Sequence, residues 1–205
     1  MNLLERIHDG YIYNRRVRVL SDHLSQLIPE NASVLDVGCG DGQVSRLIMG
    51  RRPDVTLVGI DRLVRRQSCI PVKWFDGQAI PYEDDSFHAV MLVDVLHHTD
   101  DPMILLREAV RVSRTTILCK DHTLNGAFAG PTLRFLDWVG NARHGVALTY
   151  NYWSEQRWFD AFDMLDLRIS TWKKDLGLYP PPIDWIAGRS LHFIARLDLG
   201  GRHAR

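Results

Sequence analysis

Short apolar runs alternate with amphipathic segments along the first 120 residues of the chain. The runs have the composition of buried strands and span residues 34–37, 55–61, 70–75, 85–95 and 115–119. Segments 43–49 and 103–112 carry apolar side chains at the spacing of one helix face, with Asp100 or Asp101 expected to cap the second segment and Pro102 to open it. Apolar strands that alternate with helices predict a parallel sheet covered on both faces.

The remainder of the chain is less regular. Residues 1–28 have helical periodicity, with a possible break at Gly10, and predict an N-terminal helical cap. Residues 121–150 are rich in glycine and aromatic residues and show no period, so we expect an irregular segment, with 121–153 acting as a substrate lid. A helix over 153–162, capped by Asn151 or Ser154, and strands over 165–172 and 191–199 complete one predicted domain, 1–205.

A glycine-rich turn follows the first predicted strand. Its pattern is Asp36-x-Gly38-x-Gly40-x-Gly42, and the helical segment begins directly after it. Strand, glycine turn and helix form the geometry in which a nucleotide-like ligand lies against bare backbone. The dinucleotide fingerprint requires Gly or Ala at the sixth position, where this chain has Gln43. The spacing therefore disfavours a nicotinamide-dependent oxidoreductase.

Three further signals follow in order. Asp61 ends the second strand, 25 positions after Asp36 (61 − 36), where a carboxylate can accept hydrogen bonds from ribose hydroxyls. Asp76 and Gly77 follow the third strand, and the run 85–98 reads as a fourth strand with its turn. Over about residues 30–120 the chain resembles the class I S-adenosylmethionine-dependent methyltransferases, and within them the ubiquinone and menaquinone biosynthesis (type 11) subgroup.

This resemblance implies a fold, a cofactor and a set of binding residues. The fold is α/β and Rossmann-like, with seven strands in the order 3-2-1-4-5-7-6 and the last strand antiparallel. The cofactor is S-adenosylmethionine, with S-adenosylhomocysteine as product. The implied cofactor residues are Asp36, Gly38, Cys39, Gly40, Gly42, Asp61, Arg62, Asp76, Gly77, Gln78 and Asp94. At Asp94 the backbone carbonyl is the expected contact, and the side chain need have no role.

The candidate catalytic residues follow the fourth and fifth strands, whose ends face the cofactor in such a sheet. A base is needed only if the acceptor must lose a proton. His122 beside Asp121 is one candidate, His98 is another, and transfer without a side-chain base is the third possibility. Asp94 and Asp121 could mimic two ligands of a magnesium-dependent methyltransferase, but His122 stands where that pattern has Asn, so no metal is expected.

Aromatic residues in the N-terminal cap, 1–28, and in the lid, 121–153, suggest the chemical class of the methyl acceptor. Few polar side chains accompany them, which suits an apolar or aromatic small molecule methylated on oxygen or carbon, although the same rings could simply pack the lid onto the sheet. Two alternatives stay open: a non-catalytic protein that binds S-adenosylmethionine, and a methyltransferase acting on protein or RNA. The expected substrate-binding residues are Tyr11, Tyr13, His97, Phe128, Trp138 and Tyr152.

The composition of the chain bears on its binding partners and on its cellular compartment. The 205 residues carry 25 basic and 25 acidic side chains, so a net charge of zero provides no general attraction to nucleic acid. No apolar run is long enough to span a bilayer, and the N-terminus lacks the apolar core of a signal peptide. The three cysteines form no close pair and predict buried, reduced thiols in a cytoplasmic protein. Arginines 15, 16 and 18 are expected to lie on a solvated helix face.

Overall fold

The computed structural model describes residues 12–141, 149–188 and 190–201. The predicted break at Gly10 and the substrate candidate Tyr11 lie outside these residues. No helix in the described ranges combines the length and the apolar character that crossing a membrane requires. The described cysteines carry free thiols, with Cys119 buried, Cys39 half-buried and Cys69 exposed, so burial was wrongly expected for the last.

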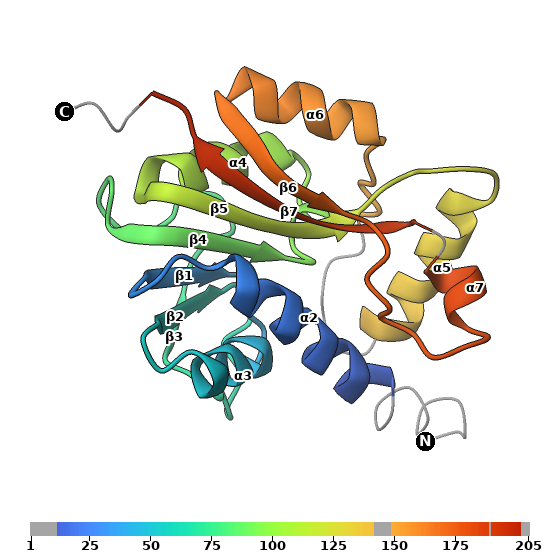
Figure 1. Cartoon of the computed structure of the whole chain (residues 1–205), viewed down its shortest axis with the longest axis horizontal. Helices are drawn as coiled ribbons and strands as arrows, with labels where there is room; N and C mark the ends of the chain where they lie inside the picture. The colour runs from blue at the N-terminus through green and yellow to red at the C-terminus, as the bar shows by residue number, and fades with distance from the viewer. Residues whose placement is uncertain (1–11, 142–148, 189, 202–205) are drawn as a thin grey trace.

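A single seven-stranded sheet forms the centre of the molecule (Figure 1). Its strand order, β3-β2-β1-β4-β5-β7-β6, confirms the predicted order. The first five strands pair in parallel, whereas β7 runs antiparallel to both β5 and β6. The strands are β1 (Ser33–Val37), β2 (Thr56–Asp61), β3 (Val72–Trp74), β4 (Phe87–Val93), β5 (Ser113–His122), β6 (Leu167–Lys173) and β7 (His192–Leu199).

Helices cover both faces of the sheet. Buried side chains of α4 (Pro102–Val112) and α6 (Glu155–Met164) join one apolar core, and those of α2 (Tyr13–Leu27) and α3 (Gln43–Arg51) join the other. In Figure 1, α5 (Ala129–Asn141) and the short α7 (Asp184–Ala187) stand beyond the ends of the central strands. The carboxyl edge of the sheet is therefore bordered by α5 and α7, two helices that do not cover either face of the sheet.

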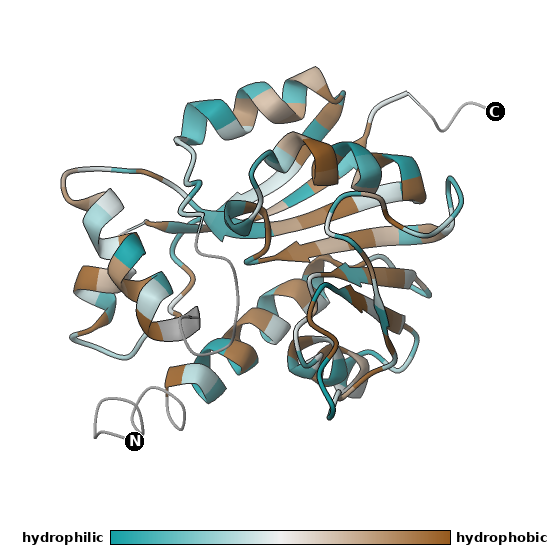
Figure 2. Cartoon of the chain, turned by 180° about the vertical axis from the view of Figure 1, so that it is seen from behind, coloured by the Kyte–Doolittle hydropathy of each residue, from teal (hydrophilic) through white to brown (hydrophobic). Residues whose placement is uncertain are grey.

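The middle strands provide most of the apolar core. Figure 2 shows these strands as largely hydrophobic, whereas the covering helices carry many hydrophilic residues. Trp158 and Phe162 of α6 are fully buried, and the Trp158 ring packs against both Phe162 and Phe193 of β7. Burial of each such aromatic side chain contributes about 1.5–3 kcal/mol, which anchors α6 and the C-terminal hairpin to the parallel sheet.

Most predicted elements are present, with one difference. The expectation of an irregular segment over 121–150 is wrong, because β5 continues to His122 and α5 follows it. Gly130 and Pro131 lowered the apparent helicity of α5, yet both fall in its first turn, where a missing backbone N–H donor costs no helical bond.

The predicted N-terminal cap of α4 can be tested directly. Asp101, with extended backbone, accepts a hydrogen bond from the Met103 N–H at 3.0 Å, and Pro102 begins the helix. We expect Asp101→Ala to lower the free energy of unfolding by about 1 kcal/mol, because the first turn loses its cap. The matched control Asp100→Ala removes the neighbouring carboxylate and should change stability by less than about 0.5 kcal/mol. Urea titration measures both, and equal effects would contradict the assignment.

Candidate active site at the carboxyl edge of the sheet

A cleft opens where β1, β4 and β5 end. Its walls combine the glycine-rich turn after β1, the turn after β4, the tip of β5, and side chains of α2 and α5. The lining residues are Tyr13, Arg16, Val17, Leu20, Asp36, Gly38, Cys39, Gly40, Asp41, Val44, Arg65, Val93, Asp94, His97, His122, Leu136 and Asp137. One cleft thus brings together five of the eleven predicted cofactor residues and two of the predicted acceptor-side histidines.

The turn after β1 forms one end of the cleft. At Gly38, where φ is +71°, any Cβ would collide with Val95, so the chain passes close to the turn after β4. At Gly40, where φ is +60°, a Cβ would meet nothing within 4 Å, so its bare backbone faces open space. The Gly40 N–H donates to Asp61 at 2.7 Å, which ties the turn to the end of β2. The backbone is therefore held open for a ligand that must approach closely.

Asp36 is a buried carboxyl beneath this turn. It accepts a hydrogen bond of 2.5 Å from the Ser45 hydroxyl on α3, and 3% of the residue is exposed. Burial raises its pKa to about 7, with Ser45 opposing the rise and Asp61 adding to it. A cationic ligand in the cleft would favour the ionised form of this carboxyl.

The residues predicted for the adenosine part lie at the ends of β2 and β3. Each oxygen of Asp61 already accepts a backbone N–H, from Gly40 and from Leu63, both at 2.7 Å. Asp76 closes its own turn by accepting from the N–H groups of Gln78 and Ala79. Gly77 lies beneath Arg62, whose Cδ would be 2.6 Å from an added Cβ. Carboxylate oxygens have a second lone pair, so these residues can still accept bonds from a ligand.

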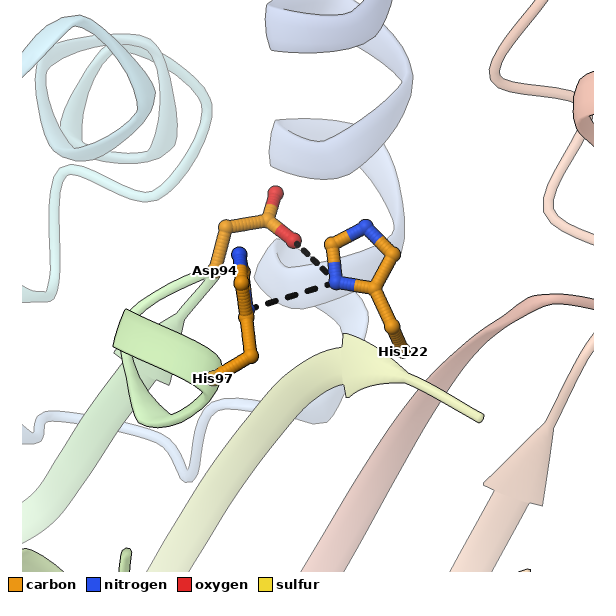
Figure 3. Close-up of side chains that lie close together, drawn as sticks. All are labelled: Asp94, His97 and His122. Atoms are coloured by element: carbon orange, nitrogen blue, oxygen red, sulfur yellow. Dashed lines mark hydrogen bonds and ion pairs between the residues drawn. The ribbon is translucent and has the colours of Figure 1, made fainter. Parts of the chain in front are cut away.

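Two histidines face each other at the other end of the cleft. Figure 3 shows His97 from the 3-10 turn η2 (Leu96–His98) and His122 from the tip of β5, with Asp94 beside them. Their Nδ1 atoms lie 3.3 Å apart, and both approach Oδ1 of Asp121, at 2.6 Å for His97 and 3.2 Å for His122. Asp121, predicted as the partner of His122, is thus shared by both rings.

The two rings carry opposite pKa shifts. Burial opposes the charged form of His97, but Asp121 and Asp137 outweigh it and raise its pKa to about 10. Burial, with Lys120 and His97 as cationic neighbours, lowers the pKa of His122 to about 4. At neutral pH the cleft therefore places a charged imidazolium beside a neutral imidazole, and the neutral ring can accept a proton.

Asp94 is the centre of a second charged group. The side chain of Lys120, which is fully buried, contacts Oδ1 of Asp94, and Arg16 of α2 contacts Oδ2 at 3.0 Å. Although burial opposes ionisation, these cations hold the pKa of Asp94 well below its ordinary value. Asp94 also has φ of +54°, an uncommon conformation for a residue other than glycine. The expectation of a solvated arginine face is thus wrong for Arg16, and the Asp94 side chain has a structural role.

The remaining predicted residues divide between the cleft and the surface. Tyr13 donates to Asp41 at 3.3 Å and joins α2 to the glycine turn. Tyr152 is buried beside the cleft, where its hydroxyl donates to Asp137 at 2.9 Å. Phe128 and Trp138 are 75% and 58% exposed and do not line the cleft. Asp137, missed from the sequence, is a lining residue from α5.

Comparison with known proteins identifies the class. A family model described as a methyltransferase domain matches residues 11–170. The match covers well over half of the chain, and the strand order and glycine turn agree with it. The chain belongs to the class I S-adenosylmethionine-dependent methyltransferases.

Individual relatives are more distant. The 27-O-demethylrifamycin SV methyltransferase of Amycolatopsis mediterranei (strain S699) is 29% identical over 131 residues, 54% of this chain and 48% of the relative. The tRNA U34 carboxymethyltransferase of Nautilia profundicola is 24% identical over 75% of this chain and 63% of the relative. The chain spans about half the length of the first of these curated relatives.

One solved structure supports the fold across nearly the whole chain. It is a complex between the Haloferax volcanii Trm112 methyltransferase activator and a methyltransferase described there as putative. The TM-score is 0.66 at 18% identity, with 97% of this chain and 98% of the other chain covered. At this identity the likeness concerns the fold alone.

The buried carboxyl of Asp36 gives a pH-dependent prediction. A pKa that rises from 3.8 to about 7 on folding means that the folded protein binds more protons between these values, so stability falls as pH rises through about 7. Asp36→Asn removes this dependence. Relative to wild type, the variant should gain stability between pH 4 and pH 8, by roughly 4 kcal/mol at most. Urea unfolding of both proteins across this range measures the difference, and a constant difference would contradict the prediction.

Proposed function

We propose that this methyltransferase domain transfers a methyl group from S-adenosylmethionine to a small, apolar or aromatic acceptor, on oxygen or carbon. One observation carries the proposal: a single cleft is lined at one end by the glycine turn 38–41 and at the other by His97 and His122. Cofactor and acceptor ends are therefore continuous, as an in-line transfer requires.

The cofactor end fits S-adenosylmethionine. Asp36, Cys39 and the open backbone at Gly40 would hold the methionine part, with Asp36 as partner of its ammonium group. Asp61 would accept bonds from the ribose hydroxyls, and Asp76 with Gln78 would hold the adenine ring. When bound, the sulfonium supplies a methyl group and keeps both electrons of the broken S–C bond, leaving neutral S-adenosylhomocysteine.

The acceptor end supplies a base. His122 lines the cleft and uses Nδ1 for its contacts with Asp121 and His97, so we assign proton acceptance to Nε2. An acceptor hydroxyl would give its proton to this nitrogen as an oxygen lone pair forms the new O–C bond. Asp121 orients the ring. His98, the alternative base, does not belong to the lining of the cleft among the described residues.

Two outer segments would enclose the acceptor. Tyr13, Arg16, Val17 and Leu20 of α2 line the cleft, in support of 1–28 as a cap. Leu136 and Asp137 of α5 support 121–153 as a lid, with Tyr152 behind them. Apolar side chains such as Val17, Leu20 and Leu136 alternate here with charged groups, which favours a small acceptor that has both an apolar body and a polar group. The partial likeness to a tRNA-modifying enzyme makes RNA the second class of acceptor.

Cofactor binding is the first prediction of this proposal. Calorimetric titration should give micromolar affinity for S-adenosylmethionine and S-adenosylhomocysteine, and no binding of NADH. Asp61→Ala should weaken both sulfur ligands at least about tenfold, because it removes a charge-assisted bond to ribose and releases Gly40. Asp100→Ala, an exposed control, should bind as wild type does. No binding of either sulfur ligand to the wild type would sink the proposal.

Turnover with a panel of phenols and quinols tests the acceptor and the base. His122→Asn should lower kcat by about 10²–10⁴, because proton removal is lost, while S-adenosylmethionine affinity changes far less. His88→Asn is the matched control, since His88 bonds to Ser33 far from the cleft. Full turnover in His122→Asn would exclude its role as base. Methylation of tRNA in place of the small molecules would move the acceptor class to RNA.

A further inference from the structure

We propose that the exposed segment after β2, together with one residue of the outer strand β3, docks on the surface of an anionic membrane. The docking surface consists of Leu63, Val64, Arg65, Arg66 and Trp74, all of which are exposed. Leu63, Val64 and Trp74 are 44%, 47% and 66% exposed, which is high for large apolar side chains. Apolar side chains that stand in solvent beside cations are typical of surfaces that bind lipid headgroups and the outer part of the acyl layer.

The charge of this part of the chain has one sign. Between Asp61 and Asp76 the sequence has three arginines, one lysine and no acidic residue, although the whole chain has no net charge. Residues 62–69 are all exposed. In the part of the chain that the structure describes, no carboxylate forms an ion pair with Arg65 or Arg66. The surface therefore carries uncompensated positive charge, and an anionic partner complements it.

The fold brings the two parts of the docking surface to one side of the sheet. Trp74 of β3, an outer strand, pairs in register with the last residue of β2, where the exposed segment begins. Successive strand residues point to opposite faces, and Lys73 lies over the Tyr82 ring on the face that α4 covers. Trp74 therefore points to the opposite face. The exposed segment lies on that face too, because Ile70 at its end packs against Gly42 at the start of α3.

The aliphatic pair distinguishes a lipid surface from a nucleic acid. Phosphates of either partner attract arginines, and Trp74 could lie at the headgroup level of a membrane or stack on a base. Leu63 and Val64 have no such use on RNA, whereas entry into the acyl boundary removes their apolar surface from water. Arg65 and Arg66 follow them directly, so one short segment supplies both the apolar insertion and the headgroup contacts. The observations therefore favour a membrane.

The docking surface adjoins the cleft. Arg65 belongs to the surface and also lines the cleft. The N–H of Cys69, at the end of the exposed segment, donates to the carbonyl of Asp41, another lining residue, at 2.7 Å. Docking would thus hold the mouth of the cleft close to the bilayer. The use of this position rests on the proposed function: an apolar acceptor held in the membrane would enter the cleft without crossing bulk water.

Sedimentation of the full chain with vesicles tests the proposal, using phosphatidylcholine alone or mixed with about one-third phosphatidylserine. We expect binding to the anionic vesicles that weakens as salt rises, and far weaker binding to phosphatidylcholine. Arg66→Gln should weaken partition about fivefold, and Leu63→Ser combined with Val64→Ser at least about tenfold, because charge attraction and apolar insertion are lost separately. The matched control Lys73→Gln removes an exposed cation from the opposite face and should change partition less than about twofold.

The contrary outcomes are distinct. No binding of the wild type to anionic vesicles, or equal losses in Arg66→Gln and Lys73→Gln, would overturn the docking surface. Binding of labelled tRNA that Arg66→Gln weakens, without vesicle binding, would make the surface a nucleic-acid site and the membrane proposal wrong.

S-adenosylmethionine binding on the same samples separates this inference from the proposed function. Arg66, Leu63 and Val64 do not belong to the lining of the cleft among the described residues, so their variants should bind the cofactor as wild type does, which also shows that they are folded. Vesicle binding without cofactor binding would leave the docking surface intact and remove the proposed function. Cofactor binding without vesicle binding would do the reverse.

Discussion

The Asp121 carboxylate is the interaction on which the acceptor end depends. This fully buried group at the tip of β5 accepts from the N–H groups of Leu96 and His97, from Nδ1 of His97 and from the N–H of His122. It therefore joins two adjacent strand ends and fixes the orientation of both rings. A buried carboxylate with so many donors is stable as an anion, which explains why the charged form of His97 persists beside it.

A second buried charge pair lies one strand position earlier. Lys120 and Asp94 contact each other beside His122, whose Nδ1 lies 3.8 Å from Oδ1 of Asp94, and Arg16 completes the group from α2. Buried ion pairs add little net stability, because desolvation offsets most of their attraction. Their effect here is positional: Arg16 holds α2 against the sheet, and Lys120 adds to burial in lowering the pKa of His122. The same network therefore shapes the cleft and keeps one imidazole neutral.

The sequence was most informative where function depends on backbone. The glycine turn from Asp36 to Gly42 and the strand-end carboxylate Asp61 were predictable, because close ligand approach restricts these positions to few residue types. Asp137 and Arg16 were not, because their contacts depend on how α5 and α2 pack against β4 and β5. The helix α5 itself was obscured by Gly130 and Pro131 at its start. Tertiary packing, rather than local sequence pattern, determines which side chains reach the acceptor end of the cleft.

The difference between the predictable cofactor end and the unpredicted acceptor end of the cleft has an energetic basis. β1 contributes Leu35 and Val37 to one main core and Val34 to the other, whereas Leu133 of α5 packs with Ala129, Tyr152 and Leu191 in a small separate cluster. Changes around Leu133 therefore disturb few of the contacts that hold the sheet together, whereas Leu136 packs against one of the main cores. Function on a shared fold varies where such changes are tolerated. The cofactor end can then remain fixed while α5, which brings Leu136 and Asp137 to the lining of the cleft, varies.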